Sequence, residues 1–392
     1  MRYRADDGVS LIEYAGLLVL AAIILGGLYA IVPGPVRTHT TAAICRIVHA
    51  GAAADCPAGG VRPQGHCEAF CPTPQNPIHP SDPVVAATKG GLVSLGDSYA
   101  SGEGANNGGH YLPGSEQDKC HRAPGAFSEG LRKQFTFTGG SRFVACSGAT
   151  TVDISQGRYG EKPQLDALDA HTTAVTLSIG GDDLHFLEVM TACMTDLHIS
   201  LKFWDRPKED QCHAQEKNIA ADMRHLFGHP PDPSRYQQTL EKIHQKAPNA
   251  RILVSGYPHL FPDPPDKRYL TLNKSDQAYL NDKARGLNTA IQRQVQEEDA
   301  KWYGAGQQKM GGFEYVDNWD AMKGHEVTTD HPWINPHQTC LPVIDRKDPN
   351  CPGPEPFTGT GTFHPNADGQ RAFQQAYARQ LREGPGRVLY DP

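Results

Sequence analysis

The sequence has no block of basic residues and no large excess of charge of either sign. Its 392 residues include 37 Lys and Arg and 44 Asp and Glu, which gives a formal net charge of −7. Without a basic segment there is no electrostatic basis for binding nucleic acid, so we expect no nucleic-acid partner. Hydrophobic residues make up 38% of the chain, which is typical of a globular protein, and no internal repeat is visible.

Charged residues are also missing between Glu13 and Arg37. The apolar core of this segment, residues 15–32, is long enough to cross a bilayer as a helix, although it is near the short limit. Arg2 and Arg4 precede it, which favours a cytoplasmic N-terminus and an exported remainder. A small-residue cleavage site is lacking at the usual place, so we expect a single-pass anchor in the cell membrane, with release to the extracellular space as an alternative. A buried core helix is the other reading of this run.

The residues before the apolar run indicate how the N-terminus is processed. Gly8-Val9-Ser-Leu-Ile-Glu13-Tyr14 resembles the processing site of Flp-type (type IVb) pilins, in which a prepilin peptidase cuts after the glycine. The resemblance implies cleavage between Gly8 and Val9, with a prepilin peptidase as a partner. A Glu such as Glu13 inside an apolar segment is costly unless it is paired. An ordinary uncleaved signal anchor is the alternative.

The ten cysteines are even in number and widely spaced. In an exported chain such cysteines indicate disulfides, whereas in a cytosolic enzyme they suggest metal binding or redox chemistry. Residues 37–88 are rich in Pro, Gly and Ala, and we interpret them as an extracellular linker between an anchor, residues 1–36, and a globular domain, residues 89–392. We expect two disulfides in the linker, with zinc binding as the alternative. The cysteines concerned are Cys45, Cys56, Cys67 and Cys71.

From about residue 89, short apolar runs alternate with amphipathic helical patterns. This alternation predicts an α/β fold, a three-layer sandwich in which a parallel sheet of about five strands is flanked by helices. In such sheets the functional site lies at the carboxyl ends of the strands. The stretches 190–235 and 303–360 are predicted to be insertions over or beside the site. Strands are predicted at Gly91–Leu95, Ser141–Cys146, Ala174–Ile179, Arg251–Gly256 and Phe313–Val316, and helices at about 236–245, 275–300 and 367–383.

A candidate nucleophile lies in the stretch Gly96-Asp97-Ser98-Tyr99, directly after the first predicted strand and before a Gly-rich turn. This position puts the Ser98 hydroxyl at a strand end, with the backbone N–H groups of the turn facing the same pocket. A nucleophilic serine needs such surroundings, because a base must take its proton and donors must bind the oxyanion. Taken alone, a Gly-Asp-Ser tripeptide is often just a turn.

Three further blocks follow Ser98 in order, and with them the chain resembles the GDSL, or SGNH, hydrolase superfamily over about residues 90–385. It is most similar to the secreted bacterial lipase and esterase branch. The resemblance implies that Ser98 is the nucleophile, that the backbone N–H groups of Ser98 and Gly148 bind the oxyanion, and that His364 is the general base. It implies no cofactor and no metal. The three blocks are Ala145–Thr151, Ser178–Phe186 and Gly361–Gln370.

The third block departs from the family, because Asp182 stands where the family has an Asn that donates a hydrogen bond to the oxyanion. An ionised Asp only accepts hydrogen bonds, and loss of one oxyanion donor costs on the order of 10²–10³ in rate. Asp182 can still donate if burial keeps it neutral. Alternatively, the two backbone donors suffice, or activity is reduced. A metal site formed by Asp182, Asp183 and His185 is a further reading of the same block.

The fourth block departs from many family members as well. They carry an Asp three residues before the histidine, where this chain has Gly361. The branch with three disulfides resembles this chain in lacking that Asp, and there a backbone carbonyl orients the imidazole of a Ser-His dyad. Spacing alone leaves fifteen ways to connect the six cysteines of the domain. The resemblance implies the pairs Cys120–Cys146, Cys193–Cys212 and Cys340–Cys351.

The sequence thus predicts an exported serine ester hydrolase, an esterase or lipase that cleaves carboxylic esters through an acyl-enzyme on Ser98. Its expected partners are an ester or lipid substrate and the membrane. Two alternatives stay open. One is a related activity, as an acyl- or acetyl-esterase acting on a phospholipid or a polysaccharide. The other is a surface binding protein, weakly active or inactive, that keeps the hydrolase fold; Asp182 and the pilin-like N-terminus motivate this alternative.

Overall fold

The computed structural model describes residues 80–106, 109–114, 119–195, 211–229, 233–303, 310–338, 359 and 361–390. All of these belong to one compact unit, residues 77–392. No helix in this described part of the chain is long and apolar enough to span a membrane. Several predictions lie outside the described residues: the anchor at residues 15–32, the Gly8–Val9 processing site, the pairing of Cys45, Cys56, Cys67 and Cys71, and the Cys340–Cys351 disulfide.

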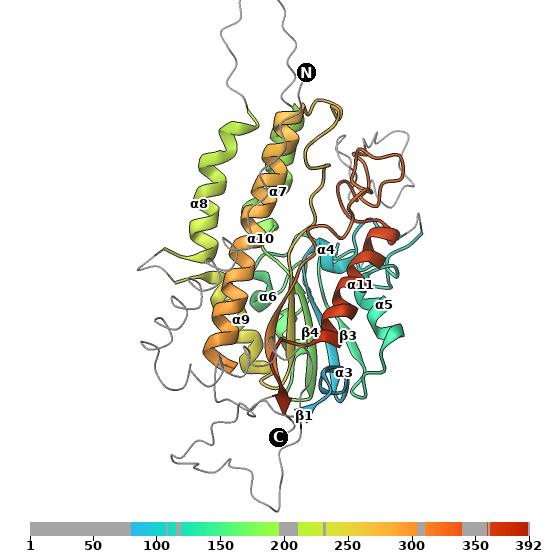
Figure 1. Ribbon diagram of the computed structural model, residues 1–392, viewed down its shortest axis with the longest axis vertical. Coiled ribbons are helices and arrows are strands. Elements are labelled where there is room, and N and C mark those ends of the chain that lie inside the picture. The colour runs from blue at the N-terminus through green and yellow to red at the C-terminus, as the bar shows by residue number, and fades with distance from the viewer. Residues whose placement is uncertain are drawn as a thin grey trace, which may run out of the picture. The chain divides into compact units, whose positions relative to one another are not determined.

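A five-stranded parallel sheet forms the centre of the unit (Figure 1), with strand order β3-β2-β4-β5-β6. The chain runs from β2 outward to β3 and then returns to β4 on the other side of β2, so the direction of winding reverses next to β2. In parallel α/β sheets, ligands bind at the carboxyl ends of the strands where this reversal occurs. The strands are β2 (Gly91–Gly96), β3 (Ser141–Phe143), β4 (Thr172–Ser178), β5 (Arg251–Ser255) and β6 (Gly312–Val316).

The predicted α/β fold with a parallel five-stranded sheet is therefore confirmed. All seven residues of β4 are buried, as expected of a parallel strand that is covered on both faces. The largest difference in strand length is at β3, which ends at Phe143 rather than Cys146. The N–H groups of Val144 and Ala145 both donate to the Ser94 carbonyl, so the chain loses the ladder register at this point and turns toward the site.

Helices cover both faces of the sheet, with α5 and α11 on one side and α9 and α10 on the other (Figure 1). The predicted helices at about 236–245, 275–300 and 367–383 are present as α9, α10 and α11. Their bounds are α9 (Arg235–Lys246), α10 (Lys274–Tyr303) and α11 (Ala367–Glu383). The other helices of the described residues are α3 (Pro83–Thr88), α4 (Ser98–Ser101), α5 (Phe127–Gln134), α6 (Asp153–Gln156), α7 (Phe186–Thr195) and α8 (Glu216–Phe227). Short 3₁₀ turns are present at η1 (Gln164–Ala167), η2 (Asp182–Leu184) and η3 (His213–Gln215).

Part of the predicted insertion at residues 190–235 is helical. It contains the end of α7 and the whole of α8, which rise together with α10 beyond the carboxyl ends of the strands in Figure 1. A disulfide between Cys193 in α7 and Cys212 before η3 joins the two parts of this segment. This is the pairing that the family resemblance implied.

Two short elements precede β2 in the compact unit. β1 (Pro80–Ser81) pairs antiparallel with β7 (Leu389–Tyr390), which brings the two ends of the described chain together. Helix α3 follows at once, and the Asp82 carboxylate caps it by accepting from Val84 N at 2.8 Å. Residues 80–88 thus lie in the compact unit of residues 77–392, and the Pro-rich stretch contains a capped helix start.

A buried ion pair fixes the sheet at the end opposite the site. Arg251 and Glu314, neighbours on β5 and β6, both have fully buried side chains. Arg251 donates to the two Glu314 oxygens at 2.6 and 2.7 Å and also to the carbonyl of Leu381, the last turn of α11, at 2.8 Å. It further donates to the Pro83 carbonyl in α3. One side chain thereby links two strands and two helices.

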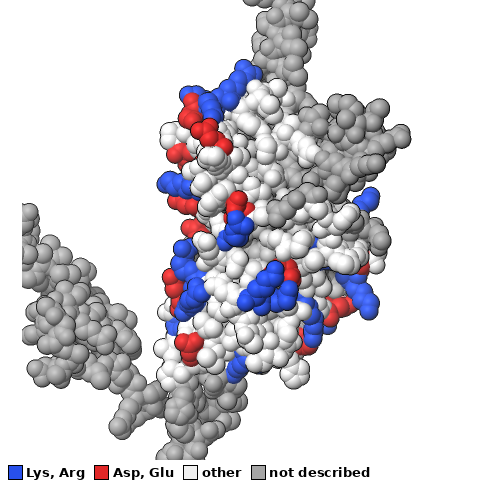
Figure 2. Space-filling view, turned by 90° about the vertical axis from the view of Figure 1, so that its right-hand side faces the viewer, with Lys and Arg blue, Asp and Glu red and all other residues white. Residues whose placement is uncertain are grey.

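The outer face near α5 and α11 carries charges of both signs close together (Figure 2). Within α5, Arg132 pairs with Glu129 at 2.6 Å, and within α11, Arg371 pairs with Asp368. Exposed pairs of this kind contribute about 1 kcal/mol or less to stability. The interior of the sheet, rather than this surface, therefore determines the fold.

Candidate active site

Ser98 is placed by a strand end and a very short helix. β2 ends at Gly96, where a Cβ would come within 2.2 Å of the Ser178 carbonyl on β4, so only glycine fits this approach. The Asp97 carboxylate then caps α4 by accepting from Tyr99 N at 3.0 Å. Ser98 is the first residue of α4, and it lines a cavity of about 530 Å³ at the carboxyl ends of the strands.

His364 lies directly beside the serine. Its Nε2 is 2.7 Å from Ser98 Oγ, and its Nδ1 is 2.8 Å from the carbonyl oxygen of Thr362. Because a carbonyl can only accept, Nδ1 must carry the hydrogen and Nε2 is the nitrogen that can accept the serine proton. The sequence predicted a backbone carbonyl near Gly361 in this role without identifying it, and the structure identifies Thr362.

The loop that carries His364 is held on several sides. Tyr99, next to the serine, donates its hydroxyl proton to the Phe363 carbonyl at 2.8 Å, and its ring centroid lies 5.1 Å from that of His364. Asn335 N donates to the His364 carbonyl at 2.8 Å, and Phe363 N donates to the Asn335 carbonyl at 3.0 Å. The imidazole is therefore oriented before any substrate arrives. Sequence reasoning identified neither Tyr99 nor Asn335 as a supporting residue.

Gly148 reaches the same cavity from the turn after β3. Cys146 N donates to the Gly96 carbonyl at 3.0 Å, so this turn lies beside the end of β2. A disulfide joins Cys120 to Cys146, the pairing that the family resemblance implied. Gly148 has φ of +72°, a left-handed conformation that favours glycine, and a Cβ there would lie 2.9 Å from the Arg158 guanidinium.

Asp182 enters the cavity from the turn after β4, where it begins η2. Burial, together with the negative charges of Asp97 and Glu103, raises the pKa of Asp182 well above its usual value. A neutral carboxyl carries a proton that it can donate, as the Asn of other family members does with its amide. The structure thus gives this departure from the family a physical account.

The contacts of Asp183 and His185 do not support the alternative metal reading of Asp182, Asp183 and His185. Asp183 accepts two hydrogen bonds from Thr151, at 2.6 and 2.9 Å. His185 has a mostly exposed side chain, and its Nδ1 lies 3.2 Å from Asp222. Two of the three side chains therefore have separate partners outside the group.

Asp97 and Tyr257 link the serine turn to the Asp182 turn. The Tyr257 hydroxyl donates to the Asp97 carboxylate and accepts from Gly181 N at 2.8 Å. Burial raises the pKa of Asp97 to about 7, against the lowering effect of the Tyr257 hydrogen bond. The sequence did not single out Tyr257; the available signal was its place directly after the predicted strand that ends at Gly256.

Part of the cavity lining is apolar. These side chains come from α7, α10 and the loop after β5, and they line the same cavity as Ser98, His364 and Asp182. The arrangement can therefore hold a hydrocarbon chain next to a serine, a base and hydrogen-bond donors. The apolar residues are Phe186, Leu187, Met190, Leu260, Ala284 and Leu287.

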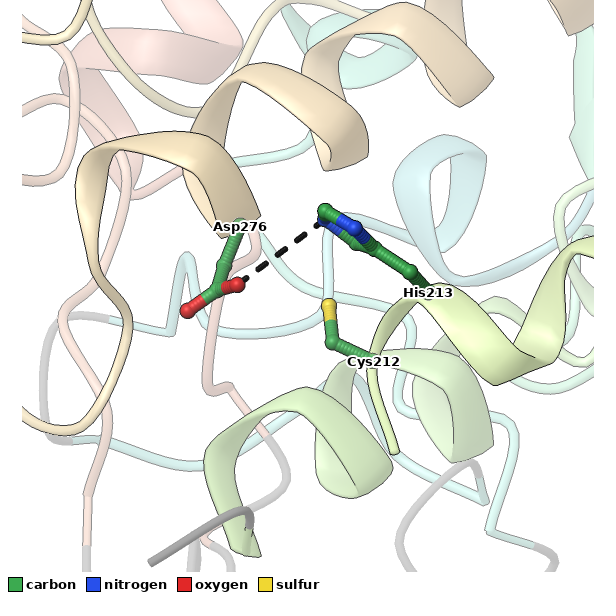
Figure 3. A group of neighbouring side chains, drawn as sticks. All are labelled: Cys212, His213 and Asp276. Carbon is green, nitrogen blue, oxygen red and sulfur yellow. Dashed lines mark ion pairs between the residues drawn. The ribbon is translucent and has the colours of Figure 1, made fainter. Parts of the chain in front are cut away.

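A group outside this cavity has the residue types of a metal site. Figure 3 shows Cys212, His213 and Asp276, whose candidate ligand atoms lie within 4.8 Å of one another. Cys212 is bonded to Cys193, so its sulfur is not a thiolate and cannot serve as a strong ligand. What remains is an ion pair of 3.9 Å between His213 Nε2 and Asp276 Oδ1. This group is therefore a structural contact beside a disulfide.

Comparison with known proteins gives a consistent result. A lipase of Streptomyces rimosus is 28% identical over 290 residues, which cover 74% of this chain and 85% of that protein. Lipase 2 of Streptomyces coelicolor is 30% identical, over 62% of this chain and 75% of that protein. The crystal structure of phospholipase A1 from Streptomyces albidoflavus NA297 superposes with a TM-score of 0.55 at 26% identity, over 74% of this chain and 99% of that one.

The extracellular lipase of Streptomyces rimosus is also similar in structure, with a TM-score of 0.53 at 25% identity, again over 74% of this chain and 99% of that one. The model of the GDSL-like lipase/acylhydrolase family matches residues 94–372, which span all four blocks around Ser98 and His364. This chain therefore belongs to the GDSL-like lipase/acylhydrolase family and is a carboxylic-ester hydrolase.

Proposed function

We propose that this hydrolase works through an acyl-enzyme on Ser98, with His364 as the general base. The observation that carries the proposal is the pair of contacts on His364, 2.7 Å from Nε2 to Ser98 Oγ and 2.8 Å from Nδ1 to the Thr362 carbonyl. A serine whose proton faces an oriented imidazole nitrogen is an activated nucleophile. This arrangement favours an enzyme over an inactive binding protein.

The reaction has two halves. Ser98 Oγ attacks the ester carbonyl carbon while its proton passes to His364 Nε2, and then the bond to the alcohol oxygen breaks and Nε2 returns the proton to that oxygen. In the second half His364 takes a proton from water, whose oxygen attacks the acyl carbon. The bond to Ser98 Oγ breaks, Oγ regains the proton, and the carboxylic acid leaves.

The negative charge on the carbonyl oxygen in each half is stabilised by the backbone N–H groups of Ser98 and Gly148 and by the protonated carboxyl of Asp182. The raised pKa of Asp182 supports this third role, because a neutral acid donates where an ionised one would repel the oxyanion. Hydrogen-bond donors fixed in advance around a developing charge supply a large part of catalysis in such enzymes.

The substrate is an ester with an aliphatic acyl chain, and a lipid is the class we favour. The apolar side chains that α7 and α10 contribute to the cavity support this, as do the names lipase and phospholipase A1 of the similar proteins. Each buried methylene contributes about 0.8 kcal/mol. A series of p-nitrophenyl esters should therefore give a higher kcat/KM for octanoate than for acetate. The opposite order would favour the acetyl-esterase alternative on a polysaccharide.

The nucleophile is tested on the full-length chain. Ser98→Ala and His364→Gln should each abolish measurable turnover, while Ser141→Ala, on the exposed start of β3, serves as the matched control and should match the unmodified enzyme. Turnover that survives in Ser98→Ala at the wild-type rate would overturn the proposal.

We also propose that residues 15–32 anchor the hydrolase domain outside the cytoplasm, joined by a linker that ends near residue 79. The apolar run supports the anchor, and the two disulfides of the described domain support an oxidising compartment. Prepilin-type processing predicts a mature N-terminus at Val9, which N-terminal sequencing of membrane-bound protein would detect. Any other mature N-terminus argues against a prepilin peptidase as partner, and protein found wholly in the medium favours release.

A further inference from the structure

A further acidic side chain, Glu103, lies in the wall of the active-site cavity. It follows Ser98 by five residues and lines the cavity together with Ser147, Gly148 and His364. The residue is only 4% exposed. A carboxylate removed from water to this degree is costly unless hydrogen bonds and charges compensate it, so its partners indicate what it does.

The partners of Glu103 include residues of the turn that carries Ser98 and of the turn that carries Gly148. One carboxylate oxygen accepts the hydroxyl proton of Ser147, the residue before Gly148, and the other lies 3.5 Å from His121 Nδ1. The backbone N–H of Glu103 donates to the Ser98 carbonyl at 3.0 Å. Glu103 therefore connects the turn that carries the nucleophile to the turn that carries an oxyanion donor.

The segment around Glu103 is held in place by its neighbours. The His121 ring stacks on Tyr111 with centroids 4.6 Å apart, and the Tyr111 hydroxyl accepts from Gly104 N at 3.3 Å. Gly104 packs against Gly361, since a Cβ on Gly104 would lie 3.0 Å from the Gly361 Cα. Glu103 thus approaches the site beside the position at which many family members carry the Asp that this chain lacks.

The charge of Glu103 acts on two groups of the mechanism. Burial tends to raise its pKa, but the contact with His121, the nearby imidazole of His364 and the hydrogen bond from Ser147 together lower it, so the group is ionised at neutral pH. The same negative charge contributes to the raised pKa of Asp182, an effect that burial and Asp97 reinforce and Arg158 opposes. One carboxylate therefore favours the protonated forms of both groups, the imidazolium that forms during reaction and the neutral acid that donates.

We propose that Glu103 is the positioning carboxylate of this site. Through Ser147 it holds the Gly148 N–H toward the oxyanion, and with its charge it supports the imidazolium that forms on His364. The inference rests on the proposed roles of Ser98, His364 and Gly148. In other family members the Asp three residues before the histidine supplies a negative charge near the imidazole. In this chain Glu103, shortly after Ser98, supplies that charge without touching the imidazole.

The charge and the hydrogen bond can be separated by mutation. Glu103→Gln keeps an oxygen that accepts from Ser147 but removes the charge, whereas Ser147→Ala removes the hydrogen bond and keeps the charge. Misplacement of a catalytic group by about 1 Å costs up to roughly 10²-fold in rate, so we expect a fall in kcat of about 10- to 100-fold in each variant, with KM little changed. Glu129→Gln, on α5 and paired with Arg132, is the matched control and should behave as wild type.

The pH profile of kcat/KM distinguishes positioning from simple loss of structure. In Glu103→Gln the alkaline limb should move to lower pH, because without the carboxylate Asp182 releases its proton more readily. In Ser147→Ala the limbs should stay in place while the maximum falls. Circular dichroism and the rate of labelling by a fluorophosphonate report whether each variant is folded and whether Ser98 is still reactive.

Wild-type kcat and an unshifted pH profile in folded Glu103→Gln would overturn the inference. If that variant does not fold, Ser147→Ala decides, and a wild-type kcat there would overturn it equally. Ser98→Ala separates this inference from the proposed mechanism. If Ser98→Ala is inactive and Glu103→Gln has wild-type kcat and pH profile, only the proposed role of Glu103 is refuted. If Ser98→Ala is active, the proposed mechanism and the role of Glu103 are both refuted.

Discussion

The carbonyl oxygen of Thr362 lies 2.8 Å from Nδ1 of His364, while Nε2 of the same ring is 2.7 Å from Ser98 Oγ. The two contacts fix the tautomer, since the carbonyl must receive the Nδ1 hydrogen. A carbonyl orients the ring but carries no net charge. The imidazolium that forms during reaction therefore depends on charges elsewhere in the site.

An Asp introduced at position 361, three residues before His364, should not improve the enzyme. A Cβ at Gly361 would lie 2.9 Å from the Gly104 Cα. Gly361→Asp and its uncharged match Gly361→Ala should both lower the free energy of unfolding, by about 1–3 kcal/mol, and both should lower kcat. Urea unfolding and ester turnover measure these effects. A Gly361→Asp enzyme with wild-type stability and a higher kcat would show that this account of the histidine is wrong.

Asp182 should give the enzyme an alkaline limit that an Asn would remove. Burial and the charges of Asp97 and Glu103 raise its pKa, so the carboxyl is neutral and donating below that value and ionised above it. Activity should therefore fall as the pH rises through the raised pKa. The fall should reach on the order of 10²-fold, the cost of one oxyanion donor.

In Asp182→Asn the donor is neutral at every pH, so kcat/KM should stay high where the natural enzyme declines. Asp182→Ala, which lacks a donor, is the control and should be slower than Asp182→Asn across the whole range. The pH dependence of kcat/KM for the three proteins provides the measurement. If Asp182→Asn loses its activity at the same alkaline pH as the natural enzyme, the neutral-acid role is refuted.

The buried pair of Arg251 and Glu314 should contribute to stability without affecting catalysis. Removing one partner leaves the other charge buried and unpaired, which costs about 3–5 kcal/mol. We expect urea unfolding to show this loss of unfolding free energy for Arg251→Met and for Glu314→Gln. The double variant should lose less than the sum of the two single losses. Since the pair lies at the amino ends of the strands, kcat per folded molecule should not change. Losses below about 1 kcal/mol in both single variants would contradict this prediction.

Much of the site was predictable from the sequence because its residues follow strand ends. Ser98, Gly148 and Asp182 each come directly after a predicted apolar strand, and parallel strands bring their carboxyl ends to one edge of the sheet. His364 could be predicted from its block before an amphipathic helix. The residues of these four blocks line the same cavity.

The supporting residues were not predictable in this way, because their partners are distant in sequence and carry no pattern. Tyr257 reaches Asp97 across 160 positions, and Glu103 reaches Ser147 across 44. The carbonyl of Thr362 is a backbone group that any residue type would supply, so no side chain marks it. Helix α3 was missed for another reason: its capping residue Asp82 lies in a Pro-rich stretch that is typical of a linker.

Trapping the acyl-enzyme tests the central claim most directly. The full-length chain is mixed with an excess of p-nitrophenyl octanoate, quenched in acid within the first turnover, digested and examined by mass spectrometry. We predict that the octanoyl mass is found on the peptide that contains Ser98 and is lost when Ser98 is replaced by Ala. Hydrolysis at the wild-type rate with the acyl group on another residue, or with none trapped and Ser98→Ala still active, would contradict the account.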